Sequence, residues 1–194
     1  MRKTTVSRQT KETQIELSLN LDGNGKCSVT TGVGFLDHML TLLAFHAGMD
    51  LDLRMQGDLA VDDHHTIEDA GIVFGQALRQ LIGDKTGLAR YGFFILPMDE
   101  VLARAVIDLS GRAYCHFAAQ FKRNQLGGLA TENIEEFFSA LVRESAMTLH
   151  LEILSPGNDH HQAEALFKCF GRALREAVRM NARAGIPSTK GLLS

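Results

Sequence analysis

Two histidine pairs, each followed by a glutamate, are the residues of this chain whose types and spacing could do chemistry. The string Asp-His-His-Thr-Ile-Glu at 63–68 recurs as Asp-His-His-Gln-Ala-Glu at 159–164. Nine of seventeen positions are identical between 63–79 and 159–175, where unrelated segments would share about one. The chain therefore reads as a duplicated half-domain, with halves of roughly 1–92 and 93–194.

Helical spacing would let one histidine of each pair act together with its glutamate. Residues four apart lie about 40° apart around a helix axis, whereas neighbours diverge by about 100°. His64 and Glu68 can therefore bind one metal ion together, and the same holds for His160 and Glu164. The second histidine of each pair points elsewhere. The arrangement predicts two ions related by the repeat, with the ligand sets His64, Glu68 and His161, and His160, Glu164 and His65.

Two further side chains occupy matching places in the two halves. His38 is the expected fourth ligand of the first ion, and Glu136 is the carboxylate at the corresponding place in the second half. Mixed imidazole and carboxylate ligands suit Mn²⁺, Fe²⁺ or Zn²⁺, and the absence of a cysteine ligand weakens the case for structural zinc. A lone histidine pair is more often solvated or capping than a ligand, and Asp63 and Asp159 read as helix N-caps. Capping needs neither the histidines nor the glutamate, so the repeated string favours metal.

A set of cations and hydroxyls could hold an anion. Each of these groups alone is more typical of a surface or a salt bridge, but beside a metal pair they indicate a phosphorylated substrate. The residues concerned are Arg90, Arg112, Lys168, Ser188, Thr189 and Lys190.

The elements that must position these residues follow from hydrophobic periodicity. We expect an α+β fold in which strand, strand, helix, strand, helix occurs twice, with the helices on one face of each sheet. The segment 26–31 is the expected hairpin partner of 15–21, and Gly48 is the expected C-cap of the first helix. The predicted strands are 15–21, 26–31, 51–55, 101–109, 114–121 and 149–154, and the predicted helices are 35–47, 64–82, 134–146 and 160–181.

The composition of the chain limits the kinds of partner that we expect it to bind. The 194 residues carry a formal net charge of −3, which does not favour nucleic acid or an anionic membrane surface. No apolar run approaches the ~20 residues needed to cross a bilayer, and no signal peptide is recognisable. Cys27, Cys115 and Cys169 form no disulfide framework. We therefore expect a cytoplasmic protein.

Taken together, the motifs closely resemble the imidazoleglycerol-phosphate dehydratase family, from about Arg8 to Gly191. The segments that carry the resemblance are Leu-Asp-His-Met-Leu at 36–40, Asp-Asp-His-His-Thr-Ile-Glu-Asp at 62–69, Asp-Leu-Ser-Gly-Arg at 108–112, Asn-Asp-His-His at 158–161 with Glu164, Phe-Lys at 167–168, and Pro-Ser-Thr-Lys-Gly at 187–191. The resemblance implies a monofunctional lyase of histidine biosynthesis. It also implies half-domains like the second domain of ribosomal protein S5, two Mn²⁺ ions per active site, and an octahedral assembly of twenty-four subunits.

The resemblance also implies roles for single residues. His38, His64, Glu68 and His161 match one metal set, and His65, Glu136, His160 and Glu164 match the other. Glu136 departs from the family pattern, in which many relatives carry histidine. Glu12 matches a catalytic carboxylate of the family, and Glu68 and Glu164 are the other two expected catalytic residues. Substrate contacts are expected from Glu12, His38, His46, His64, His65, Arg90, Arg112, Lys168, Ser188, Thr189 and Lys190.

The implied reaction is the dehydration of imidazole glycerol phosphate to imidazole acetol phosphate. We expect it to pass through an imidazolate bound to two metal ions, with Glu12 as the base that removes a proton from carbon. We also expect sites shared between subunits, because two helices of one subunit need not face each other across both ions. A metal-dependent phosphohydrolase and a non-catalytic metal-binding protein are the alternatives.

Overall fold

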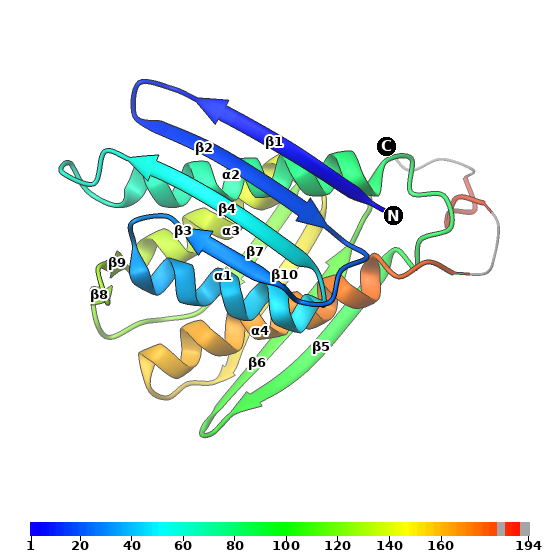
Figure 1. The fold of residues 1–194 in the computed structure, drawn as a ribbon. Coiled ribbons are helices and arrows are strands. Elements are labelled where there is room, and N and C mark those ends of the chain that lie inside the picture. Colours follow the sequence, from blue (N-terminus) through cyan, green and yellow to red (C-terminus); the bar gives the residue numbers. More distant parts are fainter. Residues whose placement is uncertain (182–184, 191–194) are drawn as a thin grey trace.

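The computed structural model describes residues 1–181 and 185–190, and its elements follow one order twice (Figure 1). The first half contains β1 (Lys3–Gln9), β2 (Thr13–Asn20), β3 (Cys27–Thr30), α1 (Gly34–Ala47), β4 (Asp50–Gly57) and α2 (His64–Ile82). The second half contains β5 (Tyr91–Met98), β6 (Val101–Asp108), β7 (Tyr114–Ala118), the short strands β8 (Gln125–Leu126) and β9 (Leu129–Ala130), α3 (Glu132–Ser145), β10 (Thr148–Ser155) and α4 (Asp159–Ala177).

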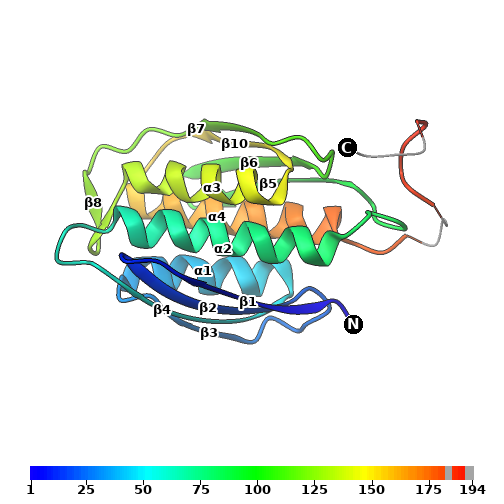
Figure 2. The ribbon, with the colours of Figure 1, turned by 90° about the horizontal axis from the view of Figure 1, so that it is seen from above.

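Each half forms one four-stranded sheet, and the two sheets have equivalent strand orders. The first is β1-β2-β4-β3 and the second is β5-β6-β10-β7. In each sheet the last strand pairs parallel with its neighbour, and the other pairs are antiparallel. The four helices lie between the two sheets, so each sheet is covered on one face (Figure 2). The α+β class and the duplicated arrangement predicted from the sequence are therefore confirmed.

The two halves are joined by helices that pack across the repeat. Helix α2 packs on α3 of the second half, and α4 packs on α1 of the first. Gly75 and Gly171, which align in the repeat, make both crossings close. A Cβ atom added at Gly75 would lie 2.5 Å from the Leu141 carbonyl oxygen, and one at Gly171 would lie 2.7 Å from the Leu43 carbonyl oxygen. The repeated glycine thus has a packing reason, because a larger residue would push the backbones apart.

Aromatic rings fill the space between the helices in the second half. Phe138 packs against Phe167 with ring centroids 4.8 Å apart, and against Phe137 and Phe170 at 5.3 Å. All four rings are fully buried. The core is therefore continuous through the helical layer, and it fixes the helices whose N-terminal ends carry the histidine pairs.

The sheets differ from the sequence prediction in two respects. Each half begins with a strand that was not expected, β1 or β5. The segment 26–31 was expected to form a hairpin with 15–21, and that prediction is wrong, because β3 pairs parallel with β4 instead. Asp50, at the start of β4, accepts hydrogen bonds from the N–H groups of Asn24 and Lys26 at 2.8 and 3.1 Å. These bonds hold the turn before β3 against the N-terminal end of β4. Strand β3 therefore lies on the side of β4 that is opposite β2.

The helix ends are partly as expected. Gly48 caps α1 with a left-handed backbone (φ 70°), as predicted. Asp63 does not cap α2 through its side chain, and the N-cap of α4 is Asn158, not Asp159. The prediction is confirmed for the position of Asp63, which is the N-cap residue of α2, and wrong for Asp159. Both side chains bind N–H groups of other segments. Asp63 accepts from the Ala130 N–H, and Asp159 accepts from two N–H groups of the 122–123 loop.

The division of the chain near residue 92 stays a prediction, because the two halves share one core. Helix α4 ends at Ala177, short of the predicted residue 181. Among residues 1–181 and 185–190, no helix is long and apolar enough to cross a membrane.

The close crossing at Gly75 can be tested with Gly75→Ala. Alanine favours a helix, but its Cβ would meet a backbone oxygen, and overpacking of this kind costs about 1–3 kcal/mol. We expect a lower thermal midpoint at fixed protein concentration. The matched control is Gly34→Ala at the start of α1, where an added Cβ has no neighbour within 4 Å. Equal midpoints for the two variants would contradict the packing role of Gly75.

Candidate metal centre

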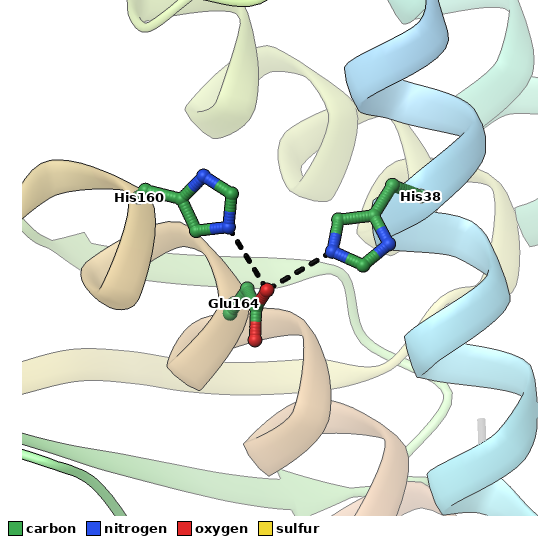
Figure 3. A group of neighbouring side chains, drawn as sticks. All are labelled: His38, His160 and Glu164. Atoms are coloured by element: carbon green, nitrogen blue, oxygen red, sulfur yellow. Dashed lines mark hydrogen bonds and ion pairs between the residues drawn. The ribbon is translucent and has the colours of Figure 1, made fainter.

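Two histidines and a glutamate from different halves of the chain meet in one cluster. His38 projects from α1, and His160 and Glu164 project from the first turns of α4 (Figure 3). The Nε2 atoms of His38 and His160 lie 2.9 and 3.0 Å from the same carboxylate oxygen, Glu164 Oε1. The structure therefore brings together His160 and Glu164 as the helical spacing predicted. It also places His38 with this pair, not with His64 and Glu68, within one chain.

Glu164 is an ionised carboxylate despite its burial. Burial alone raises the pKa of this carboxyl group, but hydrogen bonds from Lys168, His38 and His160 outweigh that effect and hold the pKa at about 2. Lys168 lies one turn further along α4 and binds the second oxygen, Oε2. A buried negative charge with three cationic or polar partners is a strong acceptor, and it is in the protonation state that a metal ligand needs.

The repeat builds a second, related cluster between α2 and α3. His64 Nε2 lies 4.0 Å from Glu68 Oε2. Arg143 of α3 bridges two carboxylates, with one guanidinium nitrogen 2.9 Å from Glu68 and another 3.3 Å from Glu136. The α2–α3 pair thus links Glu136 to Glu68 through Arg143, whereas the α1–α4 pair brings His38 into direct contact with Glu164. The correspondence of Glu136 with His38 stays a prediction.

The two histidines of each pair have different partners, in agreement with the prediction that they do not act together. Their rings remain close, with centroids 6.1 Å apart for His64 and His65 and 6.3 Å apart for His160 and His161. His65 Nδ1 donates to Asp58 at 3.0 Å, and its Nε2 lies 3.9 Å from Glu12. The hydrogen bond to Asp58 raises the pKa of His65. Glu12 therefore lies beside a predicted metal ligand.

His161 has the equivalent surroundings in the second half. Its Nδ1 donates to Glu100 at 3.0 Å, and its Nε2 lies 4.0 Å from Asp99. Glu100 also accepts the Asn158 N–H at 2.6 Å, and these two hydrogen bonds lower its pKa to about 2. Asp99 and Glu100 lie in the β5–β6 turn, which corresponds to the β1–β2 turn that carries Glu12.

Hydrogen bonds at Nδ1 select one ring nitrogen for ligation. The amide nitrogen of Asn133 donates to Asp63 at 3.1 Å, so its carbonyl oxygen faces His64 Nδ1 at 3.0 Å. His64 must then carry its proton on Nδ1, because the partner is an acceptor. Three histidines, His64, His65 and His161, are held in this way by oxygen acceptors from other elements. Each keeps Nε2 free for a metal ion, which is the usual arrangement around ligating histidines.

These orienting residues were not found by sequence reasoning. Glu100 carried no signal, because β1 and β5 were not predicted and the equivalence of the turns at Glu12 and Glu100 is visible only in the fold. Asp58, Asn133 and Arg143 carried none, because their partners lie on elements that meet only in the folded chain.

The predicted phosphate-binding residues fall into two groups. Lys168 belongs to the Glu164 cluster, and half-buried His46 lies near it. Burial, Lys168 and Arg172 lower the pKa of His46. Arg90 lies at the other end of the molecule, where its backbone N–H binds the Ala177 carbonyl at the end of α4.

The distal group is separated from the histidine cluster by the length of α4. That helix has 19 residues, or about 27 Å at 1.5 Å per residue. The Arg90 side chain binds both carboxylate oxygens of Asp108 and the Pro187 carbonyl, and the hydrogen bond to Asp108 raises its pKa. Arg112 is exposed, and Ser188, Thr189 and Lys190 form a turn. Gly191 of the predicted motif lies outside the described residues. One chain therefore does not bring this group to the predicted metal ligands.

The comparisons with known proteins agree on one family. Residues 31–174 match the family described as imidazoleglycerol-phosphate dehydratase. A protein of that name from Streptococcus sanguinis is 55% identical over 194 residues, with 100% of each chain covered. Another, from Exiguobacterium, is 53% identical over 191 residues, with 98% of each chain covered.

Two solved structures share the fold. The crystal structure of imidazoleglycerol-phosphate dehydratase from Staphylococcus aureus matches with a TM-score of 0.84 and 44% identity, over 92% of this chain and 99% of that one. The enzyme from Pyrococcus furiosus, in complex with (S)-C348, matches with a TM-score of 0.84 and 38% identity, over 97% of this chain and 100% of that one. This chain belongs to the imidazoleglycerol-phosphate dehydratase family.

Proposed function

We propose that this protein dehydrates imidazole glycerol phosphate to imidazole acetol phosphate with two bound Mn²⁺ ions per site. Family membership supports the reaction class. The cluster of His38, His160 and Glu164 is the observation that supports metal binding. A dehydratase must remove a hydroxyl group and a hydrogen on carbon while the phosphate stays attached. The chain offers imidazoles, carboxylates and cations suited to these separate tasks.

The donor set fits divalent transition ions. It combines imidazole nitrogens with ionised carboxylates and contains no thiolate, which suits Mn²⁺. When bound, such ions supply positive charge that favours loss of the ring proton of an imidazole substrate. The residues that would hold them are His38, His64, His65, Glu68, Glu136, His160, His161 and Glu164.

We infer that Glu12 is the residue that moves a proton. Its side chain is about half exposed, and it lies 3.9 Å from His65 Nε2, so a substrate ring near His65 would present its side chain to this carboxylate. Glu12 would take the proton from carbon after the hydroxyl group has left, and the departing hydroxide and one proton together make up the water that is released. Glu68 contacts Arg143 and Glu164 contacts Lys168, and the two carboxylates would help to orient the histidines around the ring.

The substrate phosphate needs cations that lie near the histidines. Within one chain Lys168 meets this need, but Arg90, Arg112, Ser188, Thr189 and Lys190 lie about one helix length away. We infer that the histidine end of one subunit meets the arginine end of another, so that a complete site contains residues of several subunits. A closed assembly of twenty-four subunits would repeat this contact at every site.

The reaction itself is tested by removing and restoring the metal. Protein stripped with chelator should lose turnover, and Mn²⁺ should restore formation of imidazole acetol phosphate, because the ligands without an ion cannot activate the ring. Inorganic phosphate is measured in the same samples. Release of phosphate in place of dehydration would establish a phosphohydrolase, and metal uptake with no turnover would establish a storage protein.

The role of Glu12 is tested with Glu12→Gln. The amide keeps the shape of the side chain but cannot accept the proton, so kcat should fall by about 10²–10⁴-fold while substrate binding is retained. Lys11→Gln, at the exposed neighbouring position, is the matched control and should keep wild-type kinetics. A near-normal kcat for Glu12→Gln would remove this residue from the role of base.

Shared sites are tested by mixing two inactive variants. Glu164→Gln removes a metal ligand, and Arg112→Ala removes a phosphate cation. If a site takes these residues from different subunits, random reassembly from metal-free chains should restore up to about a quarter of wild-type activity. If one subunit supplied both, each chain of the mixture would carry a defect and the activity would not recover.

A further inference from the structure

A second group of metal-binding side chains lies on the outer face of the sheet β5-β6-β10-β7, which is turned away from the helices. His150 of β10 and His116 of β7 are directly opposite each other in the parallel pair. Glu152 follows two residues after His150 and therefore shares its face. The neighbouring residues Leu149 and Leu151 point inward and are fully buried. The sheet thus separates this group from the cluster at Glu164.

The three side chains converge without a change of backbone. One donor atom from each residue lies within 4.8 Å of the other two. His116 Nε2 is 3.9 Å from Glu152 Oε1, and the two imidazole centroids are 5.3 Å apart. Ligands of a tetrahedral Zn²⁺ at ordinary bond lengths lie about 3.3 Å from each other. Small side-chain rotations would therefore bring these donors onto one ion.

Neighbouring side chains hold two of the three donors in place. Arg104 of β6 donates to Glu152 Oε2 at 2.7 Å, which leaves Oε1 toward the histidines. The Tyr114 ring packs against His150 with centroids 5.6 Å apart. The ligands of known metal sites are oriented by such outer contacts.

We propose that His116, His150 and Glu152 form a third metal site, selective for Zn²⁺ and similar transition ions. Two imidazoles and one carboxylate are a recurrent zinc ligand set, and three protein ligands leave one position for water. The imidazoles favour zinc over Mg²⁺ or Ca²⁺, which prefer oxygen. This site is separate from the dehydratase chemistry, because its ligands lie on the opposite face of the sheet.

The test measures zinc bound per chain. Full-length protein is dialysed to equilibrium against micromolar Zn²⁺, and the bound metal is counted by mass spectrometry. His116→Ala and Glu152→Gln each remove one ligand at a solvent-accessible position, so both should fold and bind one zinc fewer per chain than wild type. Tyr114→Phe, which keeps the ring beside His150, is the matched control and should bind as much zinc as wild type.

Dehydratase activity with Mn²⁺ separates this site from the proposed function. We expect His116→Ala and Glu152→Gln to keep wild-type turnover. Equal zinc contents in all four proteins would overturn the proposal and leave the group as an ion pair. A loss of zinc with a parallel loss of turnover would also overturn it, because the ion would then belong to the dehydratase site. If wild-type protein fails to dehydrate the substrate, the proposed function fails, while the zinc difference still decides this inference.

Discussion

The carboxylate clusters at Glu164 and Glu68 depend on the packing of each histidine-pair helix against the middle helix of the other half. Because α2 packs on α3 and α4 packs on α1, neither half contains a complete cluster. His38 meets Glu164 only across the repeat, and Glu136 is tied to Glu68 only across the repeat, through Arg143. Gly75 and Gly171 permit the short distance between helices that these contacts require. The helix packing that forms the core thus also brings these side chains together.

Burial of the Glu164 carboxylate between the helices has a desolvation cost that other contacts must offset. Removing a charge from water costs several kcal/mol unless the charge is paired and hydrogen-bonded. Lys168 supplies the pairing from the next helical turn, while His38 and His160 supply further hydrogen bonds. Because of these partners, a metal ion would meet a Glu164 carboxylate that is already ionised and held in position. Stabilisation of the metal-free chain and readiness for metal therefore come from one set of contacts.

The sequence predicted the parts of this centre that depend on helical period. His64 with Glu68 and His160 with Glu164 follow from a four-residue spacing, and the divergence of His65 and His161 follows from the turn per residue. Strand β1 was missed because it is polar and only Val6 is buried, so no alternation marks it. Asp63 occupies the predicted N-cap position of α2, but its side chain does not cap the helix. Its partners, Ala130 and Asn133, come from a loop and a helix that only the tertiary fold brings near.

The cluster at Glu164 and the cluster at Glu68 differ in charge. We therefore expect them to differ in how strongly a metal ion stabilises them. The Glu164 cluster has one carboxylate balanced by Lys168, whose side chain is 15% exposed. The other has two carboxylates, Glu68 and Glu136, with Arg143 as their shared cation, and Arg143 is 51% exposed. A solvent-exposed ion pair is worth little and is screened by salt. The cluster at Glu68 therefore has two carboxylates and one exposed cation, and it would be stabilised more by a divalent ion than the cluster at Glu164. The duplicated halves thus share the order of their elements but differ in the contacts and in the charge of their clusters.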